Sequence, residues 1–477
     1  MTSRRQFTLA AAAGIAVAGV GPSVRAASAY PSKRPEAAKR RFTSPAVEST
    51  IARASAAIGD PEVAWLFANC YPNTLDTTII ATGAVDGKPD TYAITGDIDA
   101  MWLRDSAAQV WPYLPLLRQD DALRRMVLGI VYRHARCVLL DPYANAFYRD
   151  ASQVSEHKDD QTEMRPGVHE RKFEVDSLCY VVRLAHGYWK HSGDLAFAAD
   201  AGWLAAMRAL VRTLREQQRR DGDGPYSFRR RTDSPHDTAA GWGRGAPLKP
   251  VGLIASVFRP SDDATIFPFL IPSNYFAVQS LRQLAELLRA AGQAPDLAKD
   301  ALALAAEVDA ALRLHAVADL PEFGRVLAYE VDGYGSRALL DDSNVPSLLS
   351  LPYLGALDRR DPLYRRTRRF LTTPGAHPYV VVGKVASGIT GPHAGRDMIW
   401  PMSIMIRALT TDDEAEIAAC LRLLRDTHAG TGFMHEAFHK DDATRFTRPW
   451  FAWANSLFGE LILRVLAERP ALLARPL

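Results

Sequence analysis

Three acidic residues, one arginine and one tryptophan lie within the eleven residues from Gly96 to Ser106. They are Asp97, Asp99, Trp102, Arg104 and Asp105. An adjacent carboxylate and guanidinium can grip two neighbouring hydroxyls, and an indole ring offers a flat apolar surface to the C–H face of a sugar. The segment therefore predicts a sugar-binding site. The alternative is a helix N-terminus with aspartate caps and a structural Arg–Asp pair.

A second group of acids, Asp262 and Asp263, follows Pro260 in a segment with Phe258 and Phe267 nearby. Two adjacent carboxylates in an aromatic setting can raise the pKa of one of them, which leaves a proton for a leaving group near neutral pH. Paired acids after a proline also serve as helix caps. The pair is thus a candidate general acid with a structural alternative.

A third group, His435-Glu436-Ala437-Phe438-His439, matches the H-E-x-x-H pattern of zinc proteases, and Glu460 is a conceivable third ligand. That motif requires a helix, yet glycines precede it and Lys440-Asp441-Asp442 follows it. A loop carboxylate among aromatic residues suits a general base that positions water. With a protonated aspartate it forms the two-carboxylate machinery of a glycosidase, and a zinc hydrolase stays as the alternative.

Helical periodicity dominates the elements that must position these groups, while strand-like patches are few and do not alternate with helices. We expect about twelve helices, near 46–70, 103–117, 120–138, 174–191, 195–218, 272–292, 294–315, 343–355, 361–371, 397–409, 411–427 and 450–468. The polar segments fall mainly between these helices, and no convincing linker interrupts them. Six helical hairpins in a toroid would gather such loops at one end, so we predict an all-α fold, an (α/α)6 barrel, over 46–477.

The first 29 residues have the pattern of an export signal. Arg4 and Arg5 precede an uncharged run from Phe7 to Val20, and Ala27-Ser28-Ala29 offers a cleavage site. The pattern resembles a bacterial twin-arginine signal, so we expect a periplasmic or secreted protein after a polar linker at 30–45.

Cleavage there removes three arginines and no acid, so the net charge of +3 becomes 0. A neutral chain disfavours nucleic acid or an anionic membrane as partner. Cys70, Cys137, Cys179 and Cys420 are widely spaced, and we expect no required disulfide.

Eight segments, in order, resemble glycoside hydrolase family 125. They are Asp90–Ser106, His169–Tyr180, Phe258–Ala264, Leu340–Ser347, Ala386–His393, Ile399–Ser403, Gly432–Glu436 and Arg448–Glu460. The resemblance covers about residues 45 to 468. It implies an exo-acting α-mannosidase that removes terminal α-1,6-linked mannose with inversion, on an (α/α)6 barrel and without a catalytic metal or other cofactor.

The resemblance also implies roles for residues. It assigns Asp263 as general acid, with Asp262 beside it, and Glu436 as general base. Arg104 and Asp105 are expected to clamp the mannose, while Glu174 and Asp176 support the site from behind. The other expected substrate-binding residues are Asp97, Asp99, Trp102, Asp262, Asp342, His393, Trp400 and His435. The expected partner is a mannose-containing oligosaccharide or N-glycan, and a non-catalytic glycan-binding protein remains a further alternative.

Overall fold

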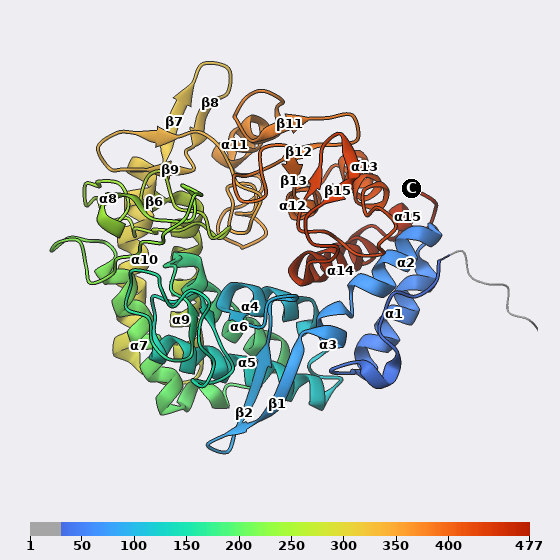
Figure 1. Ribbon diagram of the computed structural model, residues 1–477, viewed down its shortest axis with the longest axis horizontal. Helices are drawn as coiled ribbons and strands as arrows, with labels where there is room; N and C mark the ends of the chain where they lie inside the picture. The colour runs from blue at the N-terminus through green and yellow to red at the C-terminus, as the bar shows by residue number, and fades with distance from the viewer. Residues whose placement is uncertain (1–29) are drawn as a thin grey trace, which may run out of the picture. The chain divides into compact units, whose positions relative to one another are not determined.

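Helices form most of the regular structure in residues 30–477, the part of the chain that the computed structural model describes (Figure 1). Residues 1–29, where the export signal is expected, lie outside the described residues. The longer helices are α1 (Pro45–Ala57), α2 (Pro61–Cys70), α4 (Leu103–Val110), α5 (Asp121–Leu140), α6 (Val175–Ser192), α7 (Ala201–Glu216), α9 (Ile271–Ala290), α10 (Pro295–His315), α11 (Pro362–Thr372), α12 (Pro401–Leu409), α13 (Glu414–Asp426) and α14 (Ala452–Glu468). The short ones are α3 (Asn73–Thr77), α8 (Ala240–Gly243) and α15 (Pro470–Leu473), with 3-10 turns at Ala37–Lys39, Trp111–Leu116 and Ala196–Ala199.

Short antiparallel sheets connect the helices. Three sheets have three strands: β3 (Met101–Trp102) with β4 (Ala146–Phe147) and β5 (Val168–Glu170), β6 (Phe269–Leu270) with β9 (Glu330–Val331) and β10 (Arg337–Ala338), and β13 (Met398–Ile399) with β14 (Phe438–His439) and β15 (Asp442–Phe446). Three are hairpins: β1 (Ile79–Val85) with β2 (Lys88–Ala93), β7 (Val317–Leu320) with β8 (Gly324–Leu327), and β11 (Val380–Val382) with β12 (Ser387–Ile389).

The helices surround the centre of the unit Ser32–Leu477 (Figure 1). Helices α12, α14, α4, α6 and α9 pack side by side in that order. Helices α13, α2, α5, α7 and α10 pack outside them, since α13 contacts α12, α2 contacts α14, α5 contacts α6, and α10 contacts α9. Every residue of α4 is buried, whereas the outer helix α11 buries one face only, as expected for an inner and an outer layer.

Inner and outer helices also start differently. Six outer helices, α1, α2, α5, α7, α11 and α13, begin with a side chain that accepts from the first-turn amides: Ser44, Asp60, Asp120, Asp200, Asp361 and Asp413. The inner helices α4, α6, α9, α12 and α14 have no such side-chain cap. Their first-turn amides therefore keep the partial positive charge of a helix N-terminus available to other groups.

One expected helix is wrong: residues 343–355 form buried turns and no helix. Two prolines, Pro346 and Pro352, lack backbone donors, and the Asp341 carboxylate accepts from the amides of Leu348 and Leu349 at 2.8 and 3.0 Å. Side-chain bonding thus replaces the helical ladder there.

Two other expectations are refined. The region 46–70 divides into α1 and α2, because Asp60 caps a new helix that starts at Pro61. The expected linker at 30–45 packs on the helices from Ser32 onward, where the Arg34 Nε donates to Asp76 Oδ2 at 2.7 Å. No helix in 30–477 combines the length and apolar character needed to cross a bilayer. The four cysteines are buried and unpaired.

Candidate active site

The candidate active site is a pocket at the start of three inner helices. Trp102, Trp400 and Phe451 immediately precede α4, α12 and α14, and all three line it. The pocket encloses about 360 Å³ of space that no atom fills. Its lining residues are Thr95, Ile98, Trp102, Arg104, Asp105, Pro260, Ser261, Asp262, Asn344, His393, Trp400, Glu436, Arg448 and Phe451. Uncapped helix N-termini favour the carboxylates gathered here.

Arg104 is the centre of a buried charge cluster. Its Nη1 donates to Asp105 Oδ2 at 2.7 Å, and its Nη2 donates to Asp262 Oδ1 at 2.9 Å and to Glu174 Oε1 at 3.2 Å. Asp176 Oδ2 lies 3.5 Å from its Nε. The guanidinium also stands over the Trp453 ring, 5.6 Å from its centroid. Arg104 therefore organises acids and does not extend a free fork into the pocket.

Four carboxylates around one guanidinium cannot all be ionised at low cost. Burial raises the pKa of Glu174 well above its usual range, and Asp262 adds to that rise. Burial also raises the pKa of Asp105 to about 6 and that of Asp176 to about 7. The cluster therefore retains protons near neutral pH.

The side chains of Asp262 and Asp263 point in different directions although the two residues are adjacent. Asp262 has a left-handed φ of 66° and turns its carboxylate into the pocket, where 23% of the side chain is exposed. Burial works against its ionisation, but Arg104, Glu174 and Lys172 outweigh burial and hold the pKa of Asp262 below its usual range. The Lys172 Nζ donates to the Asp262 carbonyl at 2.9 Å and fixes this turn.

Asp263 points behind the pocket wall. It does not line the pocket, and 6% of its side chain is exposed. Its Oδ1 lies 3.5 Å from His393 Nδ1, and Ser261 Oγ donates to its Oδ2 at 3.2 Å. Burial opposes the charge on His393, but the contact with Asp263 prevails and raises the pKa of His393 to about 9. His393 is therefore an imidazolium at neutral pH.

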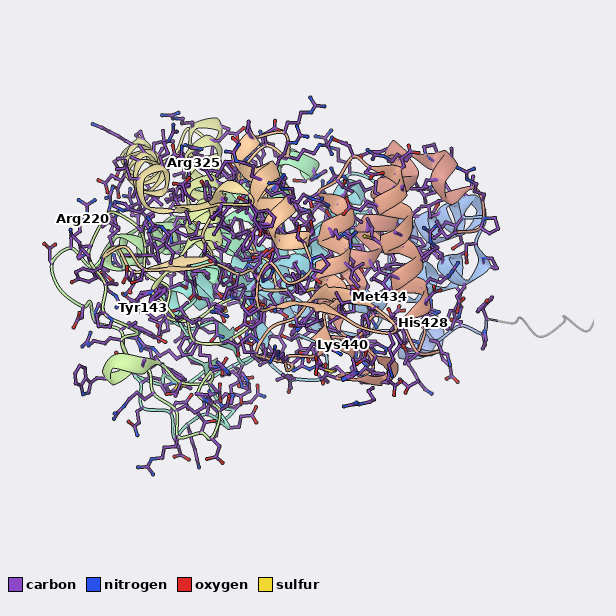
Figure 2. The ribbon with its side chains drawn as sticks, turned by 90° about the horizontal axis from the view of Figure 1, so that it is seen from above. Tyr143, Arg220, Arg325, His428, Met434 and Lys440 are labelled. Carbon is purple, nitrogen blue, oxygen red and sulfur yellow. The ribbon has the colours of Figure 1, made fainter. Side chains whose placement is uncertain are left out.

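Glu436 also lines the pocket, from the turn before β14. Figure 2 labels Met434 and Lys440, which flank it in the sequence, at the lower part of the C-terminal helices in that view. Asn455 in α14 accepts from the Met434 amide at 2.8 Å, and Thr447 Oγ1 accepts from the Ala437 amide at 3.1 Å. These bonds hold both ends of the Glu436 segment. Its Oε1 lies 3.5 Å from Arg448 Nε.

Besides Asp263, four residues expected from the sequence to bind substrate do not line the pocket. Asp97 and Asp99 are exposed near its edge, where they contact Arg448 and Gln153 respectively. Asp342 is buried behind it, 3.5 Å from Arg259 Nη1 and 3.3 Å from the Ser261 hydroxyl that donates to it. His435 turns away and stacks on Phe446 with ring centroids 4.0 Å apart.

The H-E-x-x-H segment is not arranged for zinc. Residues 435–437 have no helical structure, and Phe438–His439 is a strand. The two histidines therefore do not share a helix face. Within residues 30–477 a possible metal-ligand group of three side chains is formed by Glu156, His157 and His169, which are outside the pocket lining.

Sequence reasoning missed several pocket residues. Three of them, Arg448, Phe451 and Asn344, lie in segments that resemble the family, but their residue types alone do not indicate acid–base chemistry. Glu174 was noticed only as a supporting residue, yet it shares Arg104 Nη2 with Asp262. The pairing of residues that are 70 and 158 positions away from Arg104 has no local sequence signal.

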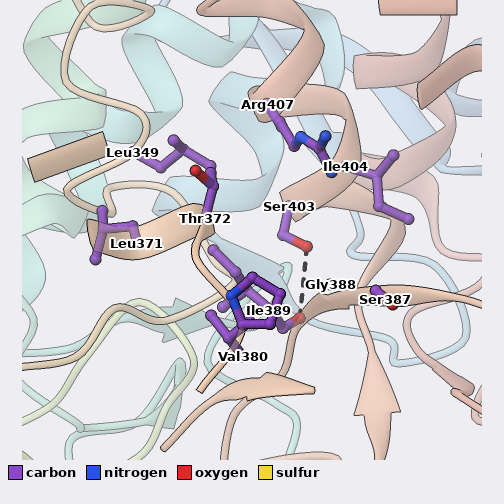
Figure 3. A pocket seen from close by; sticks show the side chains of 11 residues that line it. Leu349, Leu371, Thr372, Val380, Ser387, Gly388, Ile389, Ser403, Ile404 and Arg407 are labelled. Carbon is purple, nitrogen blue, oxygen red and sulfur yellow. Dashed lines mark hydrogen bonds between the residues drawn. The ribbon is translucent and has the colours of Figure 1, made fainter. Parts of the chain in front are cut away.

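A separate pocket is lined by β12 and by residues of α11 and α12 (Figure 3). Leu349, Val380, Ile389 and Ile404 are among its lining residues, and its lining includes no carboxylate. Ser403 Oγ donates to the Ile389 carbonyl at 3.4 Å across it. Its apolar character makes it a packing feature and not a hydrolytic site.

Comparisons with known proteins identify the family of the chain. The profile of the family of metal-independent alpha-mannosidases (GH125) matches residues 60–463. The Schizosaccharomyces pombe meiotically up-regulated gene 157 protein is 43% identical over 461 residues, which cover 93% of this chain and 90% of that protein. A structure from Streptococcus pneumoniae, a metal-independent α-mannosidase in a non-productive substrate complex with α-1,6-mannobiose, is 37% identical with a TM-score of 0.85. That match covers 90% of this chain and 100% of the other.

Proposed function

The chain belongs to the metal-independent α-mannosidases of glycoside hydrolase family 125, and we propose that it is an exo-acting, inverting α-1,6-mannosidase. The observation that carries this proposal is the pocket that unites Asp262 and Glu436 with Arg104, His393 and Trp400. The α-1,6-mannobiose bound by the Streptococcus pneumoniae relative supports the linkage and a mannose-containing glycan as substrate.

The fold that we propose for the ring of helices is the (α/α)6 barrel. Its support is the order of the inner helices α12, α14, α4, α6 and α9 and the second layer outside them. Residues 343–355, where a helix was expected, form buried turns.

Glu436 is the proposed general base, which takes a proton from the attacking water. The proposed general acid belongs to the Asp262–Asp263 pair, and the geometry favours Asp262 over the expected Asp263. Asp262 faces the pocket, and Glu174, which holds its proton near neutral pH, shares Arg104 Nη2 with it. A proton passed from Glu174 to Asp262 as substrate binds would then reach the leaving oxygen. Asp263 keeps His393 positively charged.

The substrate hydroxyls have evident partners. The indole N–H groups of Trp102 and Trp400 are buried and have no acceptor in the described structure, although both residues line the pocket. Asn344 supplies a further donor at the lining. For inversion, the acid and base carboxyl groups must leave room for a water, at a separation of roughly 6.5–9.5 Å.

Two rival functions fit less well. A zinc hydrolase needs the H-E-x-x-H segment on a helix, and the structure has a turn and a strand there. A non-catalytic glycan-binding protein needs no pair of carboxylates across its pocket. The mannosidase is the function that uses both.

Three single variants test the assignment: Asp262→Asn, Asp263→Asn and Glu436→Gln, each assayed on α-1,6-mannobiose. We expect Asp262→Asn and Glu436→Gln to lose roughly 10²–10⁴-fold in kcat, the contribution typical of general acid–base catalysis. Mannoside binding, measured by calorimetry, should survive in both. Near-normal turnover by Glu436→Gln would refute the base. An active Asp262→Asn beside an inactive Asp263→Asn would move the acid to Asp263.

We further propose that residues 1–29 direct twin-arginine export and that the mature enzyme acts in the periplasm or outside the cell. The support is the Arg4-Arg5 pair before the uncharged run. We expect cell fractionation to show export of the wild type but not of an Arg4→Lys/Arg5→Lys variant. Equal export of both would contradict it.

A further inference from the structure

Arg448 bridges the proposed base and the rim of the pocket. Its Nε lies 3.5 Å from Glu436 Oε1, and its Nη1 lies 3.4 Å from Asp97 Oδ1. Its guanidinium also stands 5.7 Å from the centroid of the Phe451 ring. One cation thus touches a carboxylate that is 9% exposed and another that is 52% exposed.

The backbone of Arg448 is tied to the segment that carries Glu436. The Thr447 amide donates to the Ala437 carbonyl at 2.9 Å, and the Arg448 carbonyl lies 3.3 Å from His435 Nδ1. Arg448 itself has a φ of 37°, in the left-handed region that side chains other than glycine rarely adopt, and Pro449 follows it. Strain of this kind persists where the surrounding structure enforces it, and it concentrates at functional sites.

The charged groups of the pocket show which cation contacts Glu436. The positive groups of the pocket are Arg104, Arg448 and His393, and the other acids at its wall are Asp105 and Asp262. Arg104 is engaged by four carboxylates and His393 by Asp263. Of these cations, Arg448 is the one in direct contact with Glu436.

We propose that Arg448 is a positioning residue that aims the Glu436 carboxylate at the attacking water, with Asp97 anchoring the far side of its guanidinium. This inference rests on the proposed role of Glu436 as base. Arg448 acts through Glu436 and takes no proton itself. The competing role for Arg448 is direct hydrogen bonding to the sugar, which would act on substrate binding.

The test compares Arg448→Gln and Arg448→Lys with the wild type and with Arg445→Gln. Arg445 is an exposed arginine on the neighbouring strand β15, so its variant loses the same charge from the same hairpin. The measurements are kcat and KM on α-1,6-mannobiose. Thermal unfolding checks that each variant is folded.

For Arg448→Gln we expect a roughly 10–100-fold loss of kcat, because a carboxylate that is no longer aimed at the water loses part of the roughly 10²–10⁴-fold contribution of general base catalysis. KM should change by less than about threefold, a small difference in binding free energy. Arg448→Lys should restore most of kcat, and Arg445→Gln should match the wild type in every measurement.

An unchanged kcat in Arg448→Gln, or a rise in KM that exceeds the fall in kcat, would overturn the positioning role. Glu436→Gln separates this from a failure of the proposed function. If Glu436→Gln is inactive and the kcat of Arg448→Gln is unchanged, only the present inference fails. If Glu436→Gln turns over normally, the assignment of the base fails first.

Discussion

The ion pair between Asp263 and His393 should give the protein a pH-dependent share of its stability. His393 has a pKa of about 9, against an ordinary value of 6.5. A difference of about 2.5 units corresponds to about 3.4 kcal/mol at 1.36 kcal/mol per unit. Because 34% of the His393 side chain is exposed, solvent screening lowers the expected contribution to about 1.5 kcal/mol.

The sign follows from proton linkage. The folded state holds the His393 proton more tightly than the unfolded state, so the contribution is complete below a pH of about 6.5 and is lost as pH rises through about 9. Asp263→Asn removes the partner and returns the pKa of His393 towards its ordinary value. The free-energy difference between wild type and variant should therefore shrink by about 1.5 kcal/mol between about pH 6 and pH 10.

Urea unfolding at several pH values, followed by tryptophan fluorescence, measures this difference for wild type, Asp263→Asn, His393→Gln and the double variant. Asp233→Asn, at an exposed site, serves as the control. The double-variant cycle should show coupling at pH 6 and none at pH 10. Parallel stability curves for wild type and Asp263→Asn over that range would refute the reasoning.

Four further predictions concern packing, charge, binding and metal. Gly129→Ala should lower the free energy of unfolding in urea by roughly 1–3 kcal/mol, because the added Cβ would lie 2.3 Å from Thr91 Oγ1. Gly83→Ala, where the added Cβ meets open space, should leave the free energy of unfolding nearly unchanged. Arg259→Met should lower the free energy of unfolding by about 3–5 kcal/mol and remove most activity, because the buried Glu330 carboxylate, which lies 2.7 Å from Arg259 Nε, loses its cation. Arg325→Met, at an exposed site, should change the free energy of unfolding little. Trp102→Phe and Trp400→Phe should each raise KM about fivefold, the effect of losing a hydrogen bond worth about 1 kcal/mol, and an unchanged KM would exclude an N–H contact to substrate. EDTA should leave kcat/KM unchanged, and a loss that zinc restores would revive the metal alternative.

The sequence indicated which residues line the pocket better than it indicated which residues contact one another. Glu436 and the Asp262–Asp263 pair were expected from acids beside aromatic residues; Glu436 and Asp262 line the pocket, but Asp263, the expected acid, does not. Arg104 was expected to clamp the mannose with Asp105, and it lines the pocket, but its further contacts with Glu174, Asp176 and Asp262 were not indicated. Such contacts arise only when separate helices meet, so no local pattern indicates them.

Local patterns also cannot show which way a side chain turns. His435 precedes Glu436 and was expected at the substrate, yet its ring stacks on Phe446. Arg448 was missed for the same reason, since its contact with Glu436 depends on a left-handed residue at the end of a hairpin. The family resemblance was confirmed, whereas the turns at 343–355 contradicted a helix expected from periodicity.

The most direct test of the central claim is the anomeric form of the first product. Proton NMR during hydrolysis of the methyl glycoside of α-1,6-mannobiose, whose reducing end is blocked, distinguishes α- from β-mannose before the two interconvert. Direct attack of a water held by Glu436 predicts β-mannose as the first sugar released from the non-reducing end. Initial release of α-mannose would contradict the account.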